Sequence, residues 1–216
     1  MVRSWRSVGL ALAAVLLAGI GAGCGDDSTA PNHVIQCPFG SRTSPENVLY
    51  NLKQAYKLRS ITEYESLLAL KPPAFTFVLS EDDQGQPGMP DSWGRQTEID
   101  IHACMFDVDT AQALTLQFDE GVREWDAVES MWSILVSNVN LHLYGIIAGQ
   151  EEEGLQELKV EGATARFWFR KEPWTAPGVS DSVWTIVKWE DNPAGSLKMP
   201  HDPETWGEIK YLYRCP

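Results

Sequence analysis

Two hydrophobic periodicities occupy separate parts of this chain, and their order restricts the fold more than any other feature. Between residues 44 and 106, apolar side chains recur mainly every three to four residues, which predicts helices. From residue 111 onward, apolar and polar residues mainly alternate, which is typical of strands with one buried face. Helices followed by an antiparallel sheet predict an α+β fold, and 216 residues suit one domain with short appendages.

The helical part contains start and stop signals. Ser44-Pro45-Glu46 combines a hydroxyl N-cap, a proline at the first helical position and an acid near the positive end of the helix dipole. Leu58-Arg59-Ser60 predicts a break, after which the apolar residues from Ile61 to Leu68 predict a second, short helix. A strand over Ala74–Leu79 and a third helix over Trp93–Phe106 are expected next.

Five later segments predict strands, because they are rich in β-branched and aromatic residues and are separated by turn residues. They are Ala113–Phe118, Trp132–Tyr144, Leu155–Phe169, Val183–Glu190 and Ile209–Arg214. The sheet is therefore expected to contain most of the second half of the chain.

This order of elements resembles the NTF2-like cone, a superfamily that includes ketosteroid isomerases, SnoaL-like cyclases and many binding domains. The run SPENVLYNLKQAYKLRSITEYESLLA followed by PAFTFVL is similar to its opening helices and first strand. The runs TARFWFRK and VWTIVKWEDN are similar to its later strands. The resemblance covers roughly residues 44–214 and implies N-terminal helices packed on a strongly curved antiparallel sheet, with a pocket between them. A lipocalin-like barrel is the alternative, but it would contain less helix.

The first 23 residues predict an export signal. Arg3 and Arg6 precede an uncharged apolar run from Val8 to Ile20, which is too short to span a hydrocarbon core of ~30 Å. Gly21-Ala22-Gly23-Cys24 then resembles a bacterial lipobox, with Gly21 where an aliphatic residue is usual. The resemblance implies that Cys24 becomes the lipidated first residue of the mature protein. The alternative is an ordinary secretory signal, which would leave Cys24 as a thiol.

This interpretation divides the chain into a signal peptide over residues 1–23, a polar tether over residues 24–43 and an NTF2-like domain over residues 44–216. Acyl chains contribute ~0.8 kcal/mol per buried methylene, so a lipid on Cys24 would hold the domain at a membrane without spanning it. We therefore expect the protein in the cell envelope, anchored to a bacterial membrane and facing the periplasm or the exterior.

The charge excludes one class of partner. The chain has 30 acidic and 17 basic residues, a net charge of −13; removal of residues 1–23 takes away two arginines and no acid, which gives −15. Phosphate groups would be repelled by such a surface, so nucleic acid is not an expected partner and the membrane contact must come from the anchor.

Three further cysteines remain after Cys24. Cys37 follows the tether and Cys215 ends the chain, so a Cys37–Cys215 disulfide would join the two ends of the domain. In the chain-entropy model, a disulfide that closes a loop of that length would stabilise the folded state by roughly 5 kcal/mol. Cys104 lies in an amphipathic segment and is expected to be a buried apolar residue. No CxxC pair occurs, and neither a metal site nor a cofactor is expected.

A ligand site is predicted from the polar faces of two strands. Strict alternation along residues 134–144 and 165–170 brings polar side chains to one face, where they would suit a small ligand with an anionic or carbonyl end. The candidate ligand-binding residues are Asn138, Asn140, His142, Arg166, Trp168 and Arg170. The alternatives are an ordinary solvated face, or an interface with a partner or a second copy in which Trp168 and Tyr144 are anchors.

Catalytic residues are not predicted. Ketosteroid-isomerase-like chemistry needs a carboxylate that moves a proton and donors that hold an oxyanion, and no motif here matches that pattern. Tyr56 is expected in the core. Glu98, Asp100 and His102 are spaced by two on a helix, about 200° apart, so we expect a helix surface and no shared metal. The expected function is non-catalytic binding of a small ligand or protein partner; the alternative is a SnoaL- or ketosteroid-isomerase-type isomerase or dehydratase that uses the cone pocket.

Overall fold

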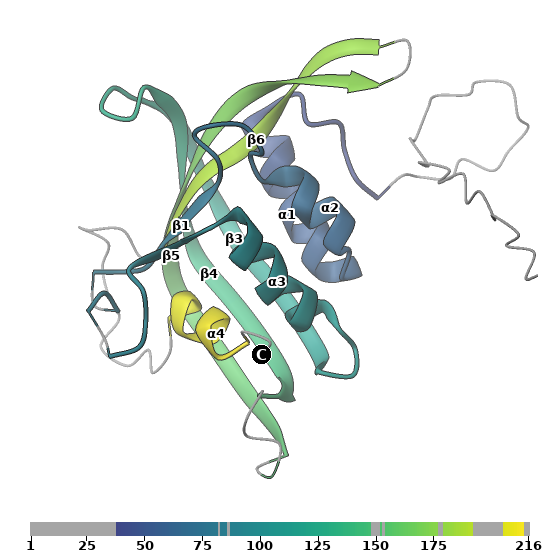
Figure 1. Cartoon of the computed structure of the whole chain (residues 1–216), viewed down its shortest axis with the longest axis vertical. Coiled ribbons are helices and arrows are strands. Elements are labelled where there is room, and N and C mark those ends of the chain that lie inside the picture. The colour runs from purple at the N-terminus through teal and green to yellow at the C-terminus, as the bar shows by residue number, and fades with distance from the viewer. Residues whose placement is uncertain are drawn as a thin grey trace, which may run out of the picture. The chain divides into compact units, whose positions relative to one another are not determined.

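The computed structural model describes residues 38–81, 83–85, 87–147, 152, 154–176, 179–191 and 205–213 (Figure 1). The elements in chain order are α1 (Pro45–Leu58), α2 (Ile61–Leu67), β1 (Thr76–Val78), β2 (Ser92–Gly94), α3 (Arg95–Phe106), β3 (Ala111–Asp126), β4 (Met131–Ile146), β5 (Leu155–Ala176), β6 (Val179–Asp191) and α4 (Trp206–Leu212). The predicted export signal, Cys24, Cys37 and Cys215 lie outside the described residues.

The fold is α+β, as predicted. One six-stranded sheet has the order β2-β1-β6-β5-β4-β3, and its neighbouring strands are antiparallel except for β1 and β6. Helices α1, α2 and α3 lie along one face of this sheet, and α4 lies beside α3 (Figure 1). Two helices, a short strand, a third helix and long antiparallel strands follow one another in the order that the NTF2-like resemblance implied.

The ends of α1 and α2 confirm the predicted signals. The side chain of Ser44 accepts a hydrogen bond from the Asn47 backbone, and Arg59 ends α1 with a left-handed backbone, φ 52°. Ser60 then caps α2 by accepting from the Glu63 backbone at 3.4 Å. The break between the two helices therefore results from a left-handed residue followed directly by a new N-cap.

The folded unit also includes the end of the predicted tether. Asn51 on α1 accepts a hydrogen bond from the Gly40 backbone N–H at 2.8 Å and donates to the Gly40 carbonyl at 2.7 Å. The Arg42 carbonyl accepts from the Trp184 backbone on β6, and Phe39 packs against the core. Residues 38–43 are thus attached to both α1 and β6.

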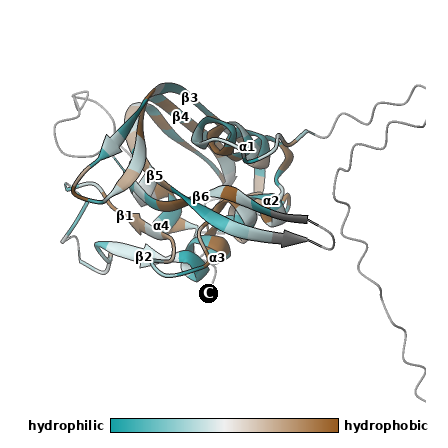
Figure 2. Ribbon diagram, turned by 90° about the horizontal axis from the view of Figure 1, so that it is seen from above, coloured by the Kyte–Doolittle hydropathy of each residue, from teal (hydrophilic) through white to brown (hydrophobic). Residues whose placement is uncertain are grey.

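The predicted strict alternation along β4 is wrong, because a bulge interrupts it. Asn138 has φ 49°, and the register to β5 shifts between Val136 and Val139. The extra residue reverses the parity of the strand, so Val136 and Val139 are both fully buried, while Leu135 is 38% exposed. Beyond the bulge, from Val139 to Gly145, buried residues of β4 alternate again with more exposed ones, and the strand carries both hydrophobic and hydrophilic residues (Figure 2).

Two other element predictions are corrected. Trp93 does not begin α3, because Ser92–Gly94 pairs with β1 as strand β2 and the helix begins at Arg95. Residues Ile209–Leu212 of the predicted strand Ile209–Arg214 belong instead to helix α4, and Arg214 lies outside the described residues. Trp206, Ile209, Lys210 and Tyr213 are all at most 1% exposed, a helical spacing that brings one face into the core.

Candidate functional site

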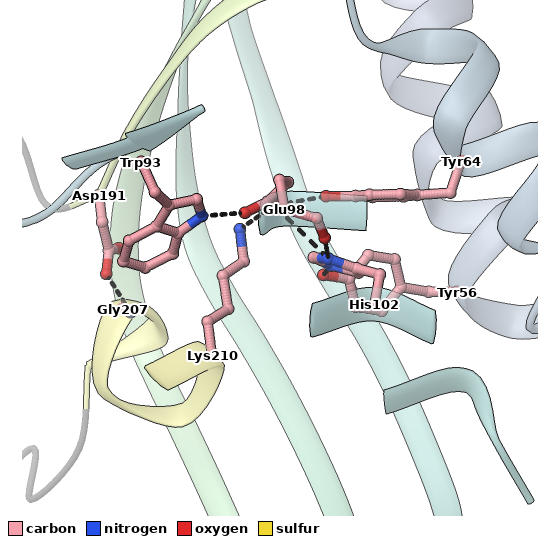
Figure 3. A network of polar contacts seen from close by, with 8 residues as sticks. All are labelled: Tyr56, Tyr64, Trp93, Glu98, His102, Asp191, Gly207 and Lys210. Atoms are coloured by element: carbon pink, nitrogen blue, oxygen red, sulfur yellow. Dashed lines mark hydrogen bonds and ion pairs between the residues drawn. The ribbon is translucent and has the colours of Figure 1, made fainter. Parts of the chain in front are cut away.

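The interior between the helices and the sheet contains a buried carboxylate with three partners (Figure 3). Glu98 on α3 is fully buried, and its Oε1 accepts from the Tyr64 hydroxyl and from the Lys210 ammonium, both at 2.6 Å. Its Oε2 accepts from the indole N–H of Trp93 at 2.6 Å. Burial acts to raise the pKa of Glu98, but the charge of Lys210 and the hydrogen bonds outweigh it, so the pKa is lowered and Glu98 is ionised.

Lys210 extends from α4 into a cage of aromatic rings. Its Nζ lies 3.8 Å from the ring centroid of Phe77, 3.6 Å from that of Trp189 and 5.3 Å from that of Trp206. Burial lowers the pKa of Lys210 to about 8, while Glu98 acts in the opposite direction. The ammonium is thus held by one carboxylate and by the faces of rings, which is the arrangement of a cation–π site.

His102 lies one helical turn after Glu98 on α3 and is neutral. Its Nδ1 is 2.9 Å from the Glu98 carbonyl, and its Nε2 is 2.5 Å from the Tyr56 hydroxyl. A carbonyl can only accept, so Nδ1 carries the proton and Nε2 accepts from Tyr56. The imidazole also stacks on Tyr64, with 3.9 Å between ring centroids. Burial lowers the pKa of His102 to about 3, so the ring carries no charge near neutral pH.

Helix α4 closes this interior. Asp191 at the end of β6 accepts from the Gly207 backbone at 2.7 Å. A Cβ at Gly207 would lie 2.0 Å from Cδ2 of Leu79, so a larger residue there would require the Leu79 side chain to move. Glu98, His102 and Lys210 are each 0% exposed. The interior therefore has an acid and an imidazole, but in this conformation neither is open to a substrate.

These buried residues correct one sequence-based expectation and extend another. Glu98 and His102 are not on a helix surface, because the contacts of α3 with α2 and α4 enclose that side of the helix; Asp100 alone is exposed, where it accepts from Gln96. Tyr56 is buried in the core as predicted, and it also donates to His102. The i, i+4 spacing of Glu98 and His102 was a usable signal. Lys210 gives no such signal, because the sequence predicts a strand for its segment.

The six predicted ligand-binding residues do not form one cluster. Asn140 and His142 lie on β4, where His142 pairs across the strand with Lys159 of β5, while Arg170 follows eleven residues later on β5. At ~3.3 Å per residue that separation is about 35 Å of strand. A single small ligand cannot contact both ends of this set.

Each of the six has its own partners. Asn138 donates to Asp119 at 2.7 Å, Asn140 donates to the Asn138 carbonyl, and His142 is 2.7 Å from Glu157. Trp168 is 4% exposed and donates to Asp126, with Lys188 4.2 Å and Arg166 5.9 Å from its ring centroid. Arg170 donates to the carbonyls of residues 71–73 and to Glu172. Arg170 therefore fixes a loop.

Asn140 and His142 do border an open depression on the sheet. It has a volume of about 240 Å³ and lies over β3, β4 and β5. Its lining residues are Thr115, Gln117, Asn140, Leu141, His142, Lys159, Val160 and Glu161. A depression of this size, with amide, imidazole and ammonium groups, suits part of a small polar ligand.

Cys104 is buried as expected, with 7% exposure, but it is disulfide-bonded and not a thiol. Its partner cysteine lies outside the described residues, so it is Cys24, Cys37 or Cys215 of the same chain or a cysteine of another. If the bond is within one chain, a lipid on Cys24 and a Cys37–Cys215 disulfide cannot both be present. The Cys37–Cys215 pairing therefore remains a prediction only for a chain in which Cys104 pairs with Cys24 or with another chain.

The part of the chain that the structure describes contains neither a candidate metal site nor a helix that could cross a membrane. No group of three or more histidine, cysteine, aspartate or glutamate side chains there is placed to hold a metal ion. Over the same residues, no helix combines the length and the apolar character needed to cross a bilayer.

Comparisons with known proteins do not assign a family. No family model matches the chain, and no curated protein matches it. A solved structure from Streptomyces avermitilis, described as a candidate dehydratase of the NTF2-like family, aligns at 15% identity with a TM-score of 0.39. The alignment covers 71% of this chain and all of the other. A similarity at that TM-score supports no conclusion about this chain, so any function has to be argued from its own residues.

Proposed function

We propose that this chain is an exported, lipid-anchored protein of the cell envelope whose NTF2-like domain binds a small ligand or a protein partner without catalysis. The enclosed interior of the domain is the observation that supports binding without catalysis. Glu98 and His102 are the groups there that could move a proton, and both are 0% exposed. Lys210 neutralises the first, and burial lowers the pKa of the second to about 3. A SnoaL-type or ketosteroid-isomerase-type reaction would require α4 to leave.

The proposed binding surface is the depression over β3, β4 and β5. His142 and Lys159 provide cationic or donor groups, and Asn140 provides an amide, which together fit a small molecule with an anionic or carbonyl end. Tyr144 follows on the same face of β4 and is 37% exposed. Leu135, also on β4, is 38% exposed. A protein partner, including a second copy of the chain, would use these apolar side chains as anchors.

Metabolite profiling tests the absence of catalysis. The purified protein and its Glu98→Gln variant are each incubated with a small-molecule extract, and depletion is followed by mass spectrometry. We expect no metabolite whose consumption depends on Glu98. A compound that the parent protein consumes, and that a Glu98→Gln variant shown to be folded does not, would overturn the proposal in favour of the enzyme.

Native mass spectrometry of the protein purified without denaturation tests ligand binding. A His142→Ala variant is expected to lose any retained small molecule, whereas His102→Gln, which changes a buried histidine, is expected to keep it. Retention of the same molecule by both variants would place binding elsewhere.

Cell fractionation tests the anchor. The parent protein and a Cys37→Ala control are expected in the membrane fraction, while Cys24→Ala is expected in the soluble exported fraction, because the acyl chains attach at Cys24. A Cys24→Ala protein that is processed normally and still stays in the membrane fraction would contradict lipidation.

A further inference from the structure

The interior of the domain has the chemistry of an amine-binding pocket. One carboxylate, Glu98, and two ring faces, Phe77 and Trp189, surround the Lys210 ammonium within 2.6–3.8 Å. Trp93 and Tyr64 donate to the same carboxylate and so fix its orientation. A carboxylate flanked by ring faces is the usual arrangement for binding organic cations.

All of these recognition groups lie outside α4. Tyr64 is on α2, Phe77 on β1, Trp93 on β2, Glu98 on α3 and Trp189 on β6. These elements form the folded body, and four of the groups are at most 1% exposed, with Trp93 at 6%. Helix α4 supplies only the ammonium and one further ring, that of Trp206. The pocket is therefore built by the body of the domain, and α4 fills it.

We propose that this pocket is a binding site for primary alkylammonium groups, and that Lys210 occupies it as an intramolecular ligand. A free n-alkylamine with a chain of four carbons reproduces the side chain of lysine beyond Cα. Such a ligand competes with Lys210 and binds when α4 lifts from the body. The proposal does not depend on the depression over β3, β4 and β5, because it concerns the opposite side of the sheet.

Two features of α4 make this exchange physically reasonable. A helix of seven residues is not stable in isolation, so its position depends entirely on its docking contacts. In the docked state, one buried donor also lacks a hydrogen bond: among the described residues, the indole N–H of Trp189 finds no acceptor. A tethered lysine has a high effective concentration, so the parent protein binds free amines more weakly than a protein that lacks Lys210.

Chemical rescue tests the proposal. Lys210→Ala is expected to melt at a lower temperature than the parent, and millimolar n-butylammonium is expected to restore several degrees of that loss, whereas n-butanol, its neutral analogue, is not. The double variant Glu98→Gln/Lys210→Ala should show no rescue, because the carboxylate is gone. Lys188→Ala is the matched control: Lys188 also lies over an indole ring, 4.2 Å from that of Trp168, and pairs with Glu129 at 3.2 Å, but its side chain is 25% exposed.

Equal effects of n-butylammonium on Lys210→Ala and Lys188→Ala, or equal rescue by n-butanol, would overturn the proposal. If Lys210→Ala does not fold alone, it is refolded with n-butylammonium or with n-butanol and followed by tryptophan fluorescence. Recovery with the ammonium only supports the site, and recovery with both or with neither refutes it.

Discussion

Because His102 is buried in its neutral form, the free energy of unfolding is expected to fall as the pH is lowered. Buried His102 has a pKa of about 3 in the folded state, compared with 6.5 when exposed. Between these values the unfolded chain binds one proton that the folded chain does not, so stability rises with pH through this window and is lost as the pH falls below 6.5. One proton corresponds to about 1.4 kcal/mol per pH unit.

Denaturant unfolding at pH 6.5, 5.5 and 4.5 measures this effect. Other carboxylates titrate in the same range, so the informative quantity is the difference between the parent and a His102→Gln variant, in which the amide accepts from Tyr56 but does not titrate. Between pH 6.5 and pH 4.5, the free energy of unfolding of the parent is expected to fall by up to about 2–3 kcal/mol more than that of the variant. The matched control is His142→Gln, because His142 lies on the outer face beside Glu157. Equal slopes for the parent and His102→Gln would refute the assignment of His102 as a buried neutral imidazole.

Three further predictions follow from the closed interior and the cysteines. Glu98→Gln removes the hydrogen-bonded counter-ion of the buried Lys210 ammonium and is expected to destabilise the fold by about 3–5 kcal/mol in denaturant unfolding. A loss below about 1 kcal/mol would contradict the buried pair. Gly207→Ala places a methyl group 2.0 Å from Leu79 and is expected to lower stability by about 1–3 kcal/mol, whereas Gly40→Ala, with no atom closer than 3.7 Å, should change it little. Peptide mapping without reduction is expected to find Cys104 linked to Cys37 or Cys215 when Cys24 carries lipid; detection of Cys104 as a free thiol would show this expectation to be wrong.

Local signals in the sequence were sufficient to predict where the first two helices of the domain begin. Capping by Ser44 and Ser60 depends only on nearby residues, and the structure confirms both ends. The α+β class could also be predicted, because it requires only the type and order of the elements. The lengths of the strands could not: β3 continues to Asp126 through a segment that is exposed on both faces and therefore lacks alternation.

The interior site was not predictable, because its residues meet only through tertiary contacts. Glu98 and Lys210 are 112 positions apart, and nothing local marks a lysine that will be fully buried. The strict alternation predicted along residues 134–144 is wrong for a different reason. One bulged residue, Asn138, reverses every side chain after it, and a single left-handed residue in a strand leaves no clear pattern in the sequence.

The attachment of residues 38–43 sets a limit on where the domain can operate. Gly40 is tied to Asn51 and the Arg42 carbonyl to Trp184, so the fixed body begins near Pro38. Fourteen peptide units separate that point from Cys24, and a fully extended chain covers no more than about 3.6 Å per unit. If Cys24 is acylated, the chain between it and Pro38 would therefore span about 50 Å at most. With such an anchor, the domain would meet a partner no farther from the bilayer than this span plus the length of the domain itself.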